Sequence, residues 1–231
     1  MNTGMEHRYQ DHTGMSRSQE KVFGISVFVA LLVHIAGAIG IAFFDRSFFL
    51  QLTPVNLLLM FVLLVWNERN RTKAWLVFFL IAFSIGLITE IIGVNTALLF
   101  GHYAYGNLLG PKVAGVPLLI GINWFCIVCC SIQTILFLFP SIDQKPLLAS
   151  LFAATLATLF DWIMEPVAMA MEYWHWQQGT IPVYNYVCWF LIAWLISWLY
   201  FRVKPKSANR FARILILVQV IFFLFLRYTL H

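Results

Sequence analysis

Charged residues are scarce in this chain of 231 residues: Asp, Glu, Lys and Arg make up 11% of it, and hydrophobic residues make up 61%. A soluble globular domain of this length needs a more polar surface, so that class is excluded. The mean hydropathy of +0.81 instead predicts a polytopic integral membrane protein, all-α in class.

The groups that several membrane chemistries need are also missing. All six Lys lie at the ends of apolar runs or between them, which excludes a retinal Schiff base. The six His do not form the closely spaced boxes of di-iron hydroxylases and desaturases. A single Asp inside the apolar runs excludes the paired Asp-rich magnesium motifs of prenyl transferases. No Gly-rich turn for a nucleotide is present, so we expect no cofactor.

The four Cys do not indicate a metal site. Cys126, Cys129, Cys130 and Cys188 stand in apolar stretches without His or Asp at the spacing of metal ligands, so we expect no metal. Buried small hydrophobic residues are the favoured interpretation. A functional thiol pair at Cys126 and Cys129 is the alternative, because the two share one helical face.

Seven apolar runs are long enough to cross a bilayer as helices, which takes about 17 to 25 residues. They are Val22–Phe44, Phe48–Trp66, Ala74–Gly93, Val116–Phe139, Pro146–Met171, Tyr184–Phe201 and Phe211–Tyr228. The first 21 residues are polar and lead into the first run without a cleavage pattern. We therefore expect a disordered cytoplasmic tail at 1–21 and a single transmembrane helical domain at 22–231.

Basic residues are distributed unevenly between the two sides of these spans. The tail and the second, fourth and sixth loops hold twelve Lys and Arg, whereas the other side holds three, Arg46, Lys112 and Arg227. The positive-inside rule then predicts a cytoplasmic (inner) membrane protein with its N-terminus in the cytoplasm and its C-terminus outside. Because these charges serve topology, we expect no nucleic-acid partner.

Three carboxylates lie inside the predicted spans: Asp161 and Glu165, in the stretch Asp161–Pro166, and Glu90. A charge at the centre of a membrane helix costs roughly 2.5 to 3.5 kcal/mol on insertion scales, so such residues usually have a function. All three come late in outward-running spans, so one pocket in the outer half of the membrane can hold them. The plain alternative is a kinked helix whose acids only bond to neighbours.

One arc of the fifth span carries Thr158, Asp161, Trp162 and Glu165, at about 100° per residue, so we expect Trp162 to point the same way as the acids. Pro166 cannot donate a hydrogen bond to the Trp162 carbonyl. That carbonyl must line a cavity or find another donor.

The third loop, 94–115, is apolar but interrupted by repeated Gly, which predicts a re-entrant, lid-like or interfacial element after the third span. An interfacial aromatic belt is the simpler interpretation for its tyrosines. Together with the fifth loop it forms a polar and aromatic cap. The candidate substrate-binding residues are Asn95, Tyr103, Tyr105, Asn123, Trp124, Trp162, Trp174, Trp176, Asn185 and Trp189.

What remains is acid–base chemistry on a lipophilic molecule. Burial favours the neutral carboxyl, so we expect at least one acid to keep its proton and to serve as a general acid. A second carboxylate or a hydroxyl would polarise that donor, and Trp and Tyr faces would stabilise a carbocation.

Four segments in order, Glu90–Pro111, Gly115–Trp124, Asp161–Pro166 and Ile181–Trp189, resemble the carotenoid-synthesis membrane family that includes CruF-type carotenoid hydratases and bisanhydrobacterioruberin hydratases. The resemblance covers most of the membrane region. It implies a cofactor-independent hydro-lyase that adds water across the terminal 1,2 double bond of an acyclic carotenoid end group, of gamma-carotene or lycopene type, to give a tertiary alcohol.

In that interpretation Asp161 or Glu165 protonates the alkene, the cation forms beneath Trp162, and Glu90 orients or deprotonates the water. The expected partners are a lipophilic carotenoid, membrane lipids and other carotenoid-synthesis enzymes. Two alternatives stay open: a proton-initiated carotenoid cyclase or isomerase, and a non-catalytic membrane carotenoid carrier or assembly partner.

Overall fold

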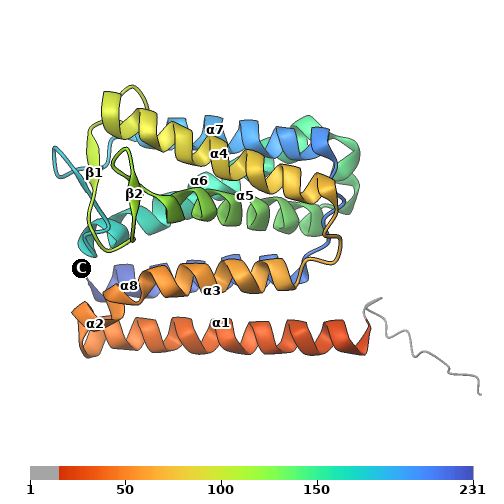
Figure 1. The fold of residues 1–231 in the computed structure, drawn as a ribbon, viewed down its shortest axis with the longest axis horizontal. Coiled ribbons are helices and arrows are strands. Elements are labelled where there is room, and N and C mark those ends of the chain that lie inside the picture. Colours follow the sequence, from red (N-terminus) through yellow and green to blue (C-terminus); the bar gives the residue numbers. More distant parts are fainter. Residues whose placement is uncertain (1–15, 231) are drawn as a thin grey trace, which may run out of the picture.

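The computed structural model describes residues 16–230, most of which lie in helices (Figure 1). The helices are α1 (Arg17–Phe43), α2 (Arg46–Gln51), α3 (Thr53–Trp66), α4 (Lys73–Thr96), α5 (Leu118–Leu138), the 3-10 helix η1 (Pro140–Gln144), α6 (Pro146–Ala170), α7 (Val183–Val203) and α8 (Arg210–Thr229). Six of them, α1, α4, α5, α6, α7 and α8, are long and apolar enough to cross a membrane. The predicted all-α polytopic membrane fold is confirmed.

The second predicted span, Phe48–Trp66, is divided by the structure. α2 ends at Gln51, and α3 begins at Thr53 with a proline in its first turn. α3 has 14 residues, about 21 Å at roughly 1.5 Å per residue, so it is shorter than the hydrocarbon core of about 30 Å. It still runs alongside α1 and α8 (Figure 1).

α1 begins earlier than the hydropathy predicted. Ser16 caps it: the Ser16 hydroxyl accepts from the Gln19 backbone N–H, and the Gln19 side chain accepts from the Ser16 N–H. This capping box satisfies two donors of the first turn. Residues 17–21 are therefore helical, which corrects this part of the predicted disordered tail. The rest of that tail lies outside the described residues.

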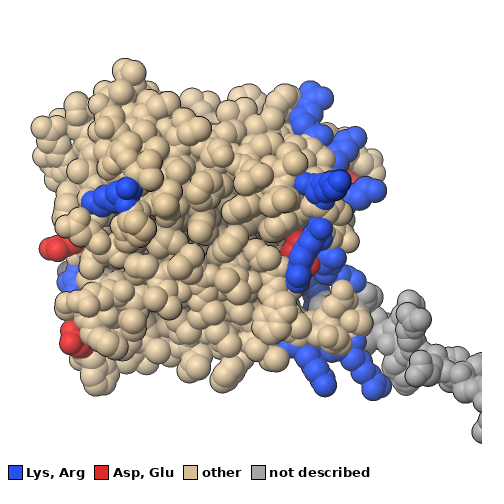
Figure 2. All heavy atoms as spheres, in the orientation of Figure 1, with Lys and Arg blue, Asp and Glu red and all other residues tan. Residues whose placement is uncertain are grey.

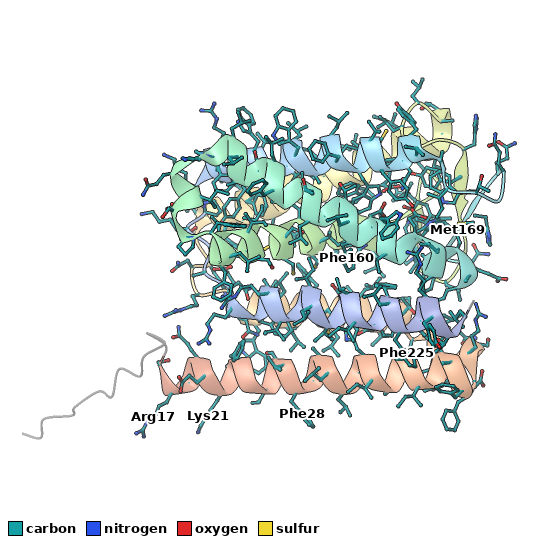
Figure 3. All side chains as sticks on the ribbon, turned by 180° about the vertical axis from the view of Figure 1, so that it is seen from behind. Arg17, Lys21, Phe28, Phe160, Met169 and Phe225 are labelled. Atoms are coloured by element: carbon teal, nitrogen blue, oxygen red, sulfur yellow. The ribbon has the colours of Figure 1, made fainter. Side chains whose placement is uncertain are left out.

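The helices form two layers (Figure 1). α1, α3 and α8 make one layer, and α4, α5, α6 and α7 make the other. α8 joins the layers, because it contacts α1 on one side and α5 and α6 on the other. Figure 3 shows the same order from behind, with Phe28 pointing away from the bundle, where its side chain is 64% exposed. Such a face suits lipid.

Lys and Arg gather at the end of the molecule where α1 begins, and few lie at the opposite end (Figure 2). The basic loops and the helix ends that carry Glu90, Asp161 and Glu165 thus lie at opposite ends of the bundle, in agreement with the uneven numbers of Lys and Arg in the loops. The assignment of the basic end to the cytoplasm stays a prediction from the positive-inside rule.

Four short strands cover the less basic end: β1 (Tyr103–Tyr105), β2 (Lys112–Val113), β3 (Val116–Pro117) and β4 (Trp174–Trp176). β1, from the third loop, pairs antiparallel with β4, from the fifth, and places Tyr103 opposite Trp176. β2 and β3 form a separate hairpin. The third loop is thus a small β cap at one end of the bundle (Figure 1), as the lid-like interpretation predicts, and it contains no further span.

Gly106, directly after β1, allows the two capping loops to approach closely. Its N–H donates to the Tyr173 carbonyl at 2.8 Å, and a Cβ at this position would lie 2.2 Å from the Glu172 carbonyl oxygen. We expect Gly106→Ala to lower the free energy of unfolding by about 1 to 3 kcal/mol, the usual effect of overpacking. Thermal unfolding in detergent measures this. Gly24→Ala is the control, since a Cβ there meets nothing within 4 Å, and equal melting temperatures for both variants would contradict the prediction.

Candidate active site

Three buried carboxyls meet beneath the β cap. Glu90 lies late in α4, and Asp161 and Glu165 lie one turn apart in α6; their side chains are 5%, 0% and 3% exposed. All three line one small cavity of about 20 Å³. The other lining residues are Phe100, Tyr103, Tyr105, Ile120, Asn123, Trp124, Met164, Trp174, Trp176, Asn185 and Trp189. The structure therefore brings together the three predicted acids and eight of the ten predicted substrate-binding residues.

Glu90 accepts hydrogen bonds on both carboxyl oxygens. Oε2 accepts from the hydroxyls of Tyr103 and Tyr105, the latter at 2.8 Å, and Oε1 accepts from the Trp124 indole N–H at 3.0 Å. These donors come from β1 and from the start of α5. Glu90 is thus enclosed by donors from two separate elements.

The tyrosines that bind Glu90 belong to the cap rather than to a span. Burial, together with the nearby Glu90 charge, raises the pKa of the Tyr103 and Tyr105 phenols above the ordinary value. Both hydroxyls therefore keep their protons, and their ability to donate, throughout the neutral pH range.

Glu165 is held by the other strand of the cap. Its Oε2 accepts from the indole N–H groups of Trp174 and Trp176, at 3.0 Å and 3.1 Å. Side chains two apart in a strand point to the same face. For this reason both tryptophans of β4 turn inward while His175, between them, is exposed. The four aromatic residues of the β1–β4 pair thus all donate to the acids below.

Asp161 has fewer partners than the two glutamates. Its Oδ2 accepts from the Asn185 side-chain N–H at 3.1 Å, whereas its buried Oδ1 has no hydrogen-bond partner among residues 16–230. Buried polar atoms nearly always have a partner. This oxygen can therefore carry a proton directed at a ligand without breaking a bond to the protein.

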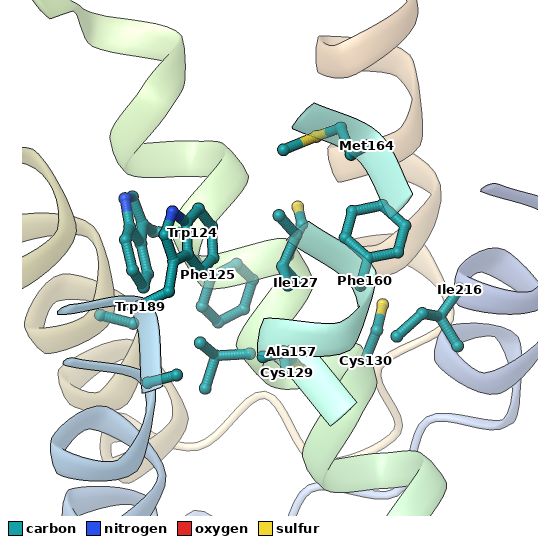
Figure 4. Packing of buried hydrophobic residues seen from close by; sticks show 14 of the residues in the cluster. Trp124, Phe125, Ile127, Cys129, Cys130, Ala157, Phe160, Met164, Trp189 and Ile216 are labelled. Atoms are coloured by element: carbon teal, nitrogen blue, oxygen red, sulfur yellow. The ribbon is translucent and has the colours of Figure 1, made fainter. Parts of the chain in front are cut away.

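A pair of stacked tryptophans forms one wall of the cavity. The rings of Trp124 and Trp189 lie 3.8 Å apart between centroids and 15° from parallel (Figure 4). Gly86 lets α4 approach this wall, because a Cβ there would be 2.4 Å from the Trp124 Cβ. Aromatic faces of this kind attract positive charge.

Trp162 does not point into the site, and the prediction that it does is wrong. Its side chain is 50% exposed, and the Arg227 guanidinium lies 4.8 Å from its ring centroid. At about 100° per residue, position 162 lies well beyond the narrow arc that joins Asp161 to Glu165. Arg227 also donates to the Trp162 carbonyl at 3.4 Å, so the acceptor freed by Pro166 is satisfied by another donor.

Asn95 also lies outside the acid cavity. Its side-chain N–H group donates to the carbonyls of Ile91 and Ala114 at 2.8 Å and 2.9 Å, and the residue is exposed. Asn95 thus ties the end of α4 to the turn of the β2–β3 hairpin. Its role in the structure is to hold this loop.

A larger, mostly apolar cavity of about 320 Å³ adjoins the acid cavity. It lies between the two helix layers, and the two cavities share four lining residues, Ile120, Asn123, Met164 and Trp174. Its remaining lining residues are Leu32, Val33, His34, Ala36, Gly37, Ile41, Phe49, Leu52, Thr53, Asn56, Leu57, Leu109, Phe160, Ala168, Met171, Tyr173, Gln219, Phe222 and Phe223. This cavity was not predicted, although the polar residues His34, Asn56 and Gln219 inside the apolar runs were an available signal.

Residues 16–230 contain no group of three or more His, Cys, Asp or Glu side chains placed to hold a metal ion. The four cysteines are free and buried.

Comparison with known proteins assigns the family. Residues 50–231 match the family model described as "Carotenoid biosynthesis protein". A bisanhydrobacterioruberin hydratase of Haloarcula japonica is 27% identical over 106 residues, which are 44% of this chain and 36% of that protein. The similarity thus spans about a third of the relative's length, and no solved structure matches the chain significantly. This chain, with its buried acids beneath an aromatic cap, belongs to the carotenoid biosynthesis protein family.

Proposed function

We propose that this protein is a carotenoid hydratase, which adds water across the terminal 1,2 double bond of an acyclic carotenoid end group and forms a tertiary alcohol. The observation that carries the proposal is the junction of the two cavities: three buried carboxyls adjoin an apolar space between membrane helices. The hydratase name of the Haloarcula japonica relative supports the reaction class.

The two cavities suit a long apolar substrate that reacts at its tip. A volume of about 320 Å³ is at the lower end of the roughly 300 to 1,000 Å³ typical of ligand sites. Leu32 and Leu52 on its wall are 55% and 42% exposed, so the rest of a polyene can extend into the lipid. The tip reaches the acids at the junction formed by Asn123 and Met164.

Asp161 is the proposed general acid. Its Oδ1 has no donor from the described residues, and Asn185 fixes the other oxygen. The π electrons of the alkene take the Asp161 proton at the less substituted carbon, and a cation forms at the tertiary carbon. Trp124 and Trp189 provide ring faces near that charge.

Glu165 is the proposed base for the water. Its Oε2 is occupied by two indole N–H groups, which leaves Oε1 to accept a proton as the water oxygen bonds to the cation. The proton then returns to Asp161, one helical turn away. Both oxygens of Glu90 already accept hydrogen bonds, from Tyr103, Tyr105 and Trp124. Glu90 therefore does not contact the water in this mechanism, and its negative charge stabilises the cation.

The proposal includes a location for the reaction, which rests on the positive-inside rule. With the basic end in the cytoplasm, the acids lie in the outer half of the inner membrane. The proposed partners are the carotenoid, the surrounding lipids and the enzymes that make or use the carotenoid.

Isotope labelling tests the proposal. Cells that make lycopene or gamma-carotene, with and without this protein, are grown in water enriched in heavy oxygen, and their carotenoids are analysed by mass spectrometry. We expect a new product heavier by one water molecule that carries the label. An unlabelled oxygen would indicate molecular oxygen as the source, and a new product of unchanged mass would indicate the cyclase or isomerase. Absence of any new product from either substrate would favour the carrier.

A further inference from the structure

Among the polar side chains that line the apolar cavity, Thr53 and Tyr173 bond to each other at 2.6 Å, and three others have no role in the proposed mechanism. His34 comes from α1, Asn56 from α3 and Gln219 from α8, and all three line the same cavity. Polar side chains inside a membrane protein are unfavourable without partners and usually mark a functional path. Their convergence from three helices indicates a ligand with hydrogen-bonding groups in this otherwise apolar space.

The hydrogen bonds of these residues leave several groups available. His34 is 5% exposed, and its Nδ1 lies 2.8 Å from the Ala30 carbonyl oxygen. Since a carbonyl can only accept, Nδ1 carries the hydrogen, and Nε2 of the neutral ring is an acceptor. The buried Asn56 Oδ1 has no partner within residues 16–230. The Gln219 amide likewise makes no hydrogen bond to another described residue.

Asn123 connects this cluster with the acids. It lines both cavities, and its side-chain amide makes no hydrogen bond to any of the residues that the structure describes. The other residues shared by the two cavities are Ile120, Met164 and Trp174, and the Trp174 N–H is already bound to Glu165. Asn123 is therefore the polar group at the junction that is available to a small ligand.

We infer that His34, Asn56 and Gln219 bind water inside the membrane portion of the protein, and that Asn123 passes this water to the acid cavity. A buried water needs two to four polar partners and about 10 to 15 Å³ of space for its centre. The larger cavity meets both requirements, and its volume of about 320 Å³ leaves space for the end of the substrate beside the water. The acid cavity of about 20 Å³ has room for about one molecule. This inference rests on the proposed function, because hydration consumes a water molecule at each turnover.

A store of water determines what happens to the carbocation. If water reaches the tertiary carbon, an alcohol forms. If it does not, the cation loses a proton from a neighbouring carbon and a double bond re-forms, so the product is an isomer of the substrate. The ratio of alcohol to isomer therefore reports water supply separately from the rate of protonation.

The test uses Asn56→Leu and Gln219→Leu in the full-length protein, with lycopene as substrate in deuterated water that also carries heavy oxygen. We expect the ratio of labelled alcohol to deuterium-containing isomer to fall by about tenfold, as for loss of one or two hydrogen bonds. Thr155→Val is the matched control. Its hydroxyl bonds only within α6, to Leu151 at 2.9 Å, and lines neither cavity.

The two substitutions lie on different helices, so the test can be carried out even if only one of the two variants folds. Gln219→Asn, which keeps an amide, should restore part of the alcohol yield. A lower rate with an unchanged product ratio would overturn the inference and leave a structural role. An unchanged ratio together with a raised KM for an oxygenated carotenoid would also overturn it, because the cluster would then bind the substrate. Failure of the wild type to form labelled alcohol would instead refute the proposed function.

Discussion

Asp161→Asn should reduce hydration by about a hundredfold to ten-thousandfold, the usual contribution of a general acid. The substitution removes the transferable proton and keeps the size of the side chain. The amide oxygen of the new residue can still accept from Asn185, which now donates to Asp161 at 3.1 Å. Formation of labelled alcohol by protein reconstituted in lipid measures the rate, and thermal unfolding checks that the variant is folded.

Asp143→Asn is the control for this substitution, because Asp143 is exposed in η1, at the opposite end of the bundle. It should retain the activity of the wild type. Full activity in a folded Asp161→Asn protein would disprove the proposed role of Asp161. If Glu165→Gln were also fully active, the proton-transfer mechanism would be refuted as a whole.

Glu90→Leu should lower the free energy of unfolding by about 3 kcal/mol or more. The substitution leaves the Trp124 N–H and the hydroxyls of Tyr103 and Tyr105 without their acceptor, and each unsatisfied buried donor costs about 1 to 3 kcal/mol. Denaturant unfolding in detergent micelles measures the change.

Glu90→Gln separates the charge of Glu90 from its hydrogen bonds. The amide oxygen can accept from Trp124, and the tyrosine hydroxyls can rotate to accept from the amide N–H groups. We therefore expect this variant to be much more stable than Glu90→Leu but to hydrate more slowly than wild type, because the negative charge near the cation is lost. Equal stability of the two variants would show that Tyr103, Tyr105 and Trp124 do not need an acceptor at position 90.

Hydropathy predicted the helices because a bilayer demands long apolar runs with internally bonded backbone. An average over a long window hid the break near Leu52, although the polar Gln51 and Thr53 and the proline in the first turn of α3 were local signals for it. It also placed the start of α1 at Val22, because the capping box at Ser16 lies in polar sequence that does not resemble a span.

The acids were recognisable because charge is rare within apolar runs. Their partners were harder to identify. Tyr103 and Trp176 meet only when two distant loops pair, and no local pattern encodes that pairing. The direction of the Trp162 side chain was predicted wrongly because helical periodicity shows which residues share a side of a helix but does not show where the buried part of that side ends. Most of the lining of the apolar cavity could not be recognised, because an apolar side chain looks the same in sequence whether it faces lipid, protein or ligand; only its few polar residues were a signal.

The pairing of β1 with β4 has a consequence for biogenesis. Glu90 and its two tyrosine donors are synthesised before α5, whereas Glu165 and its tryptophans follow from α6 onward. During insertion into the membrane, β1 therefore has no partner strand until β4 has been synthesised. A chain stopped after α5 would contain Glu90 in its cage of donors but would leave β1 without its partner strand. The acid cavity is complete only when α7, which carries Asn185 and Trp189, has followed the β cap.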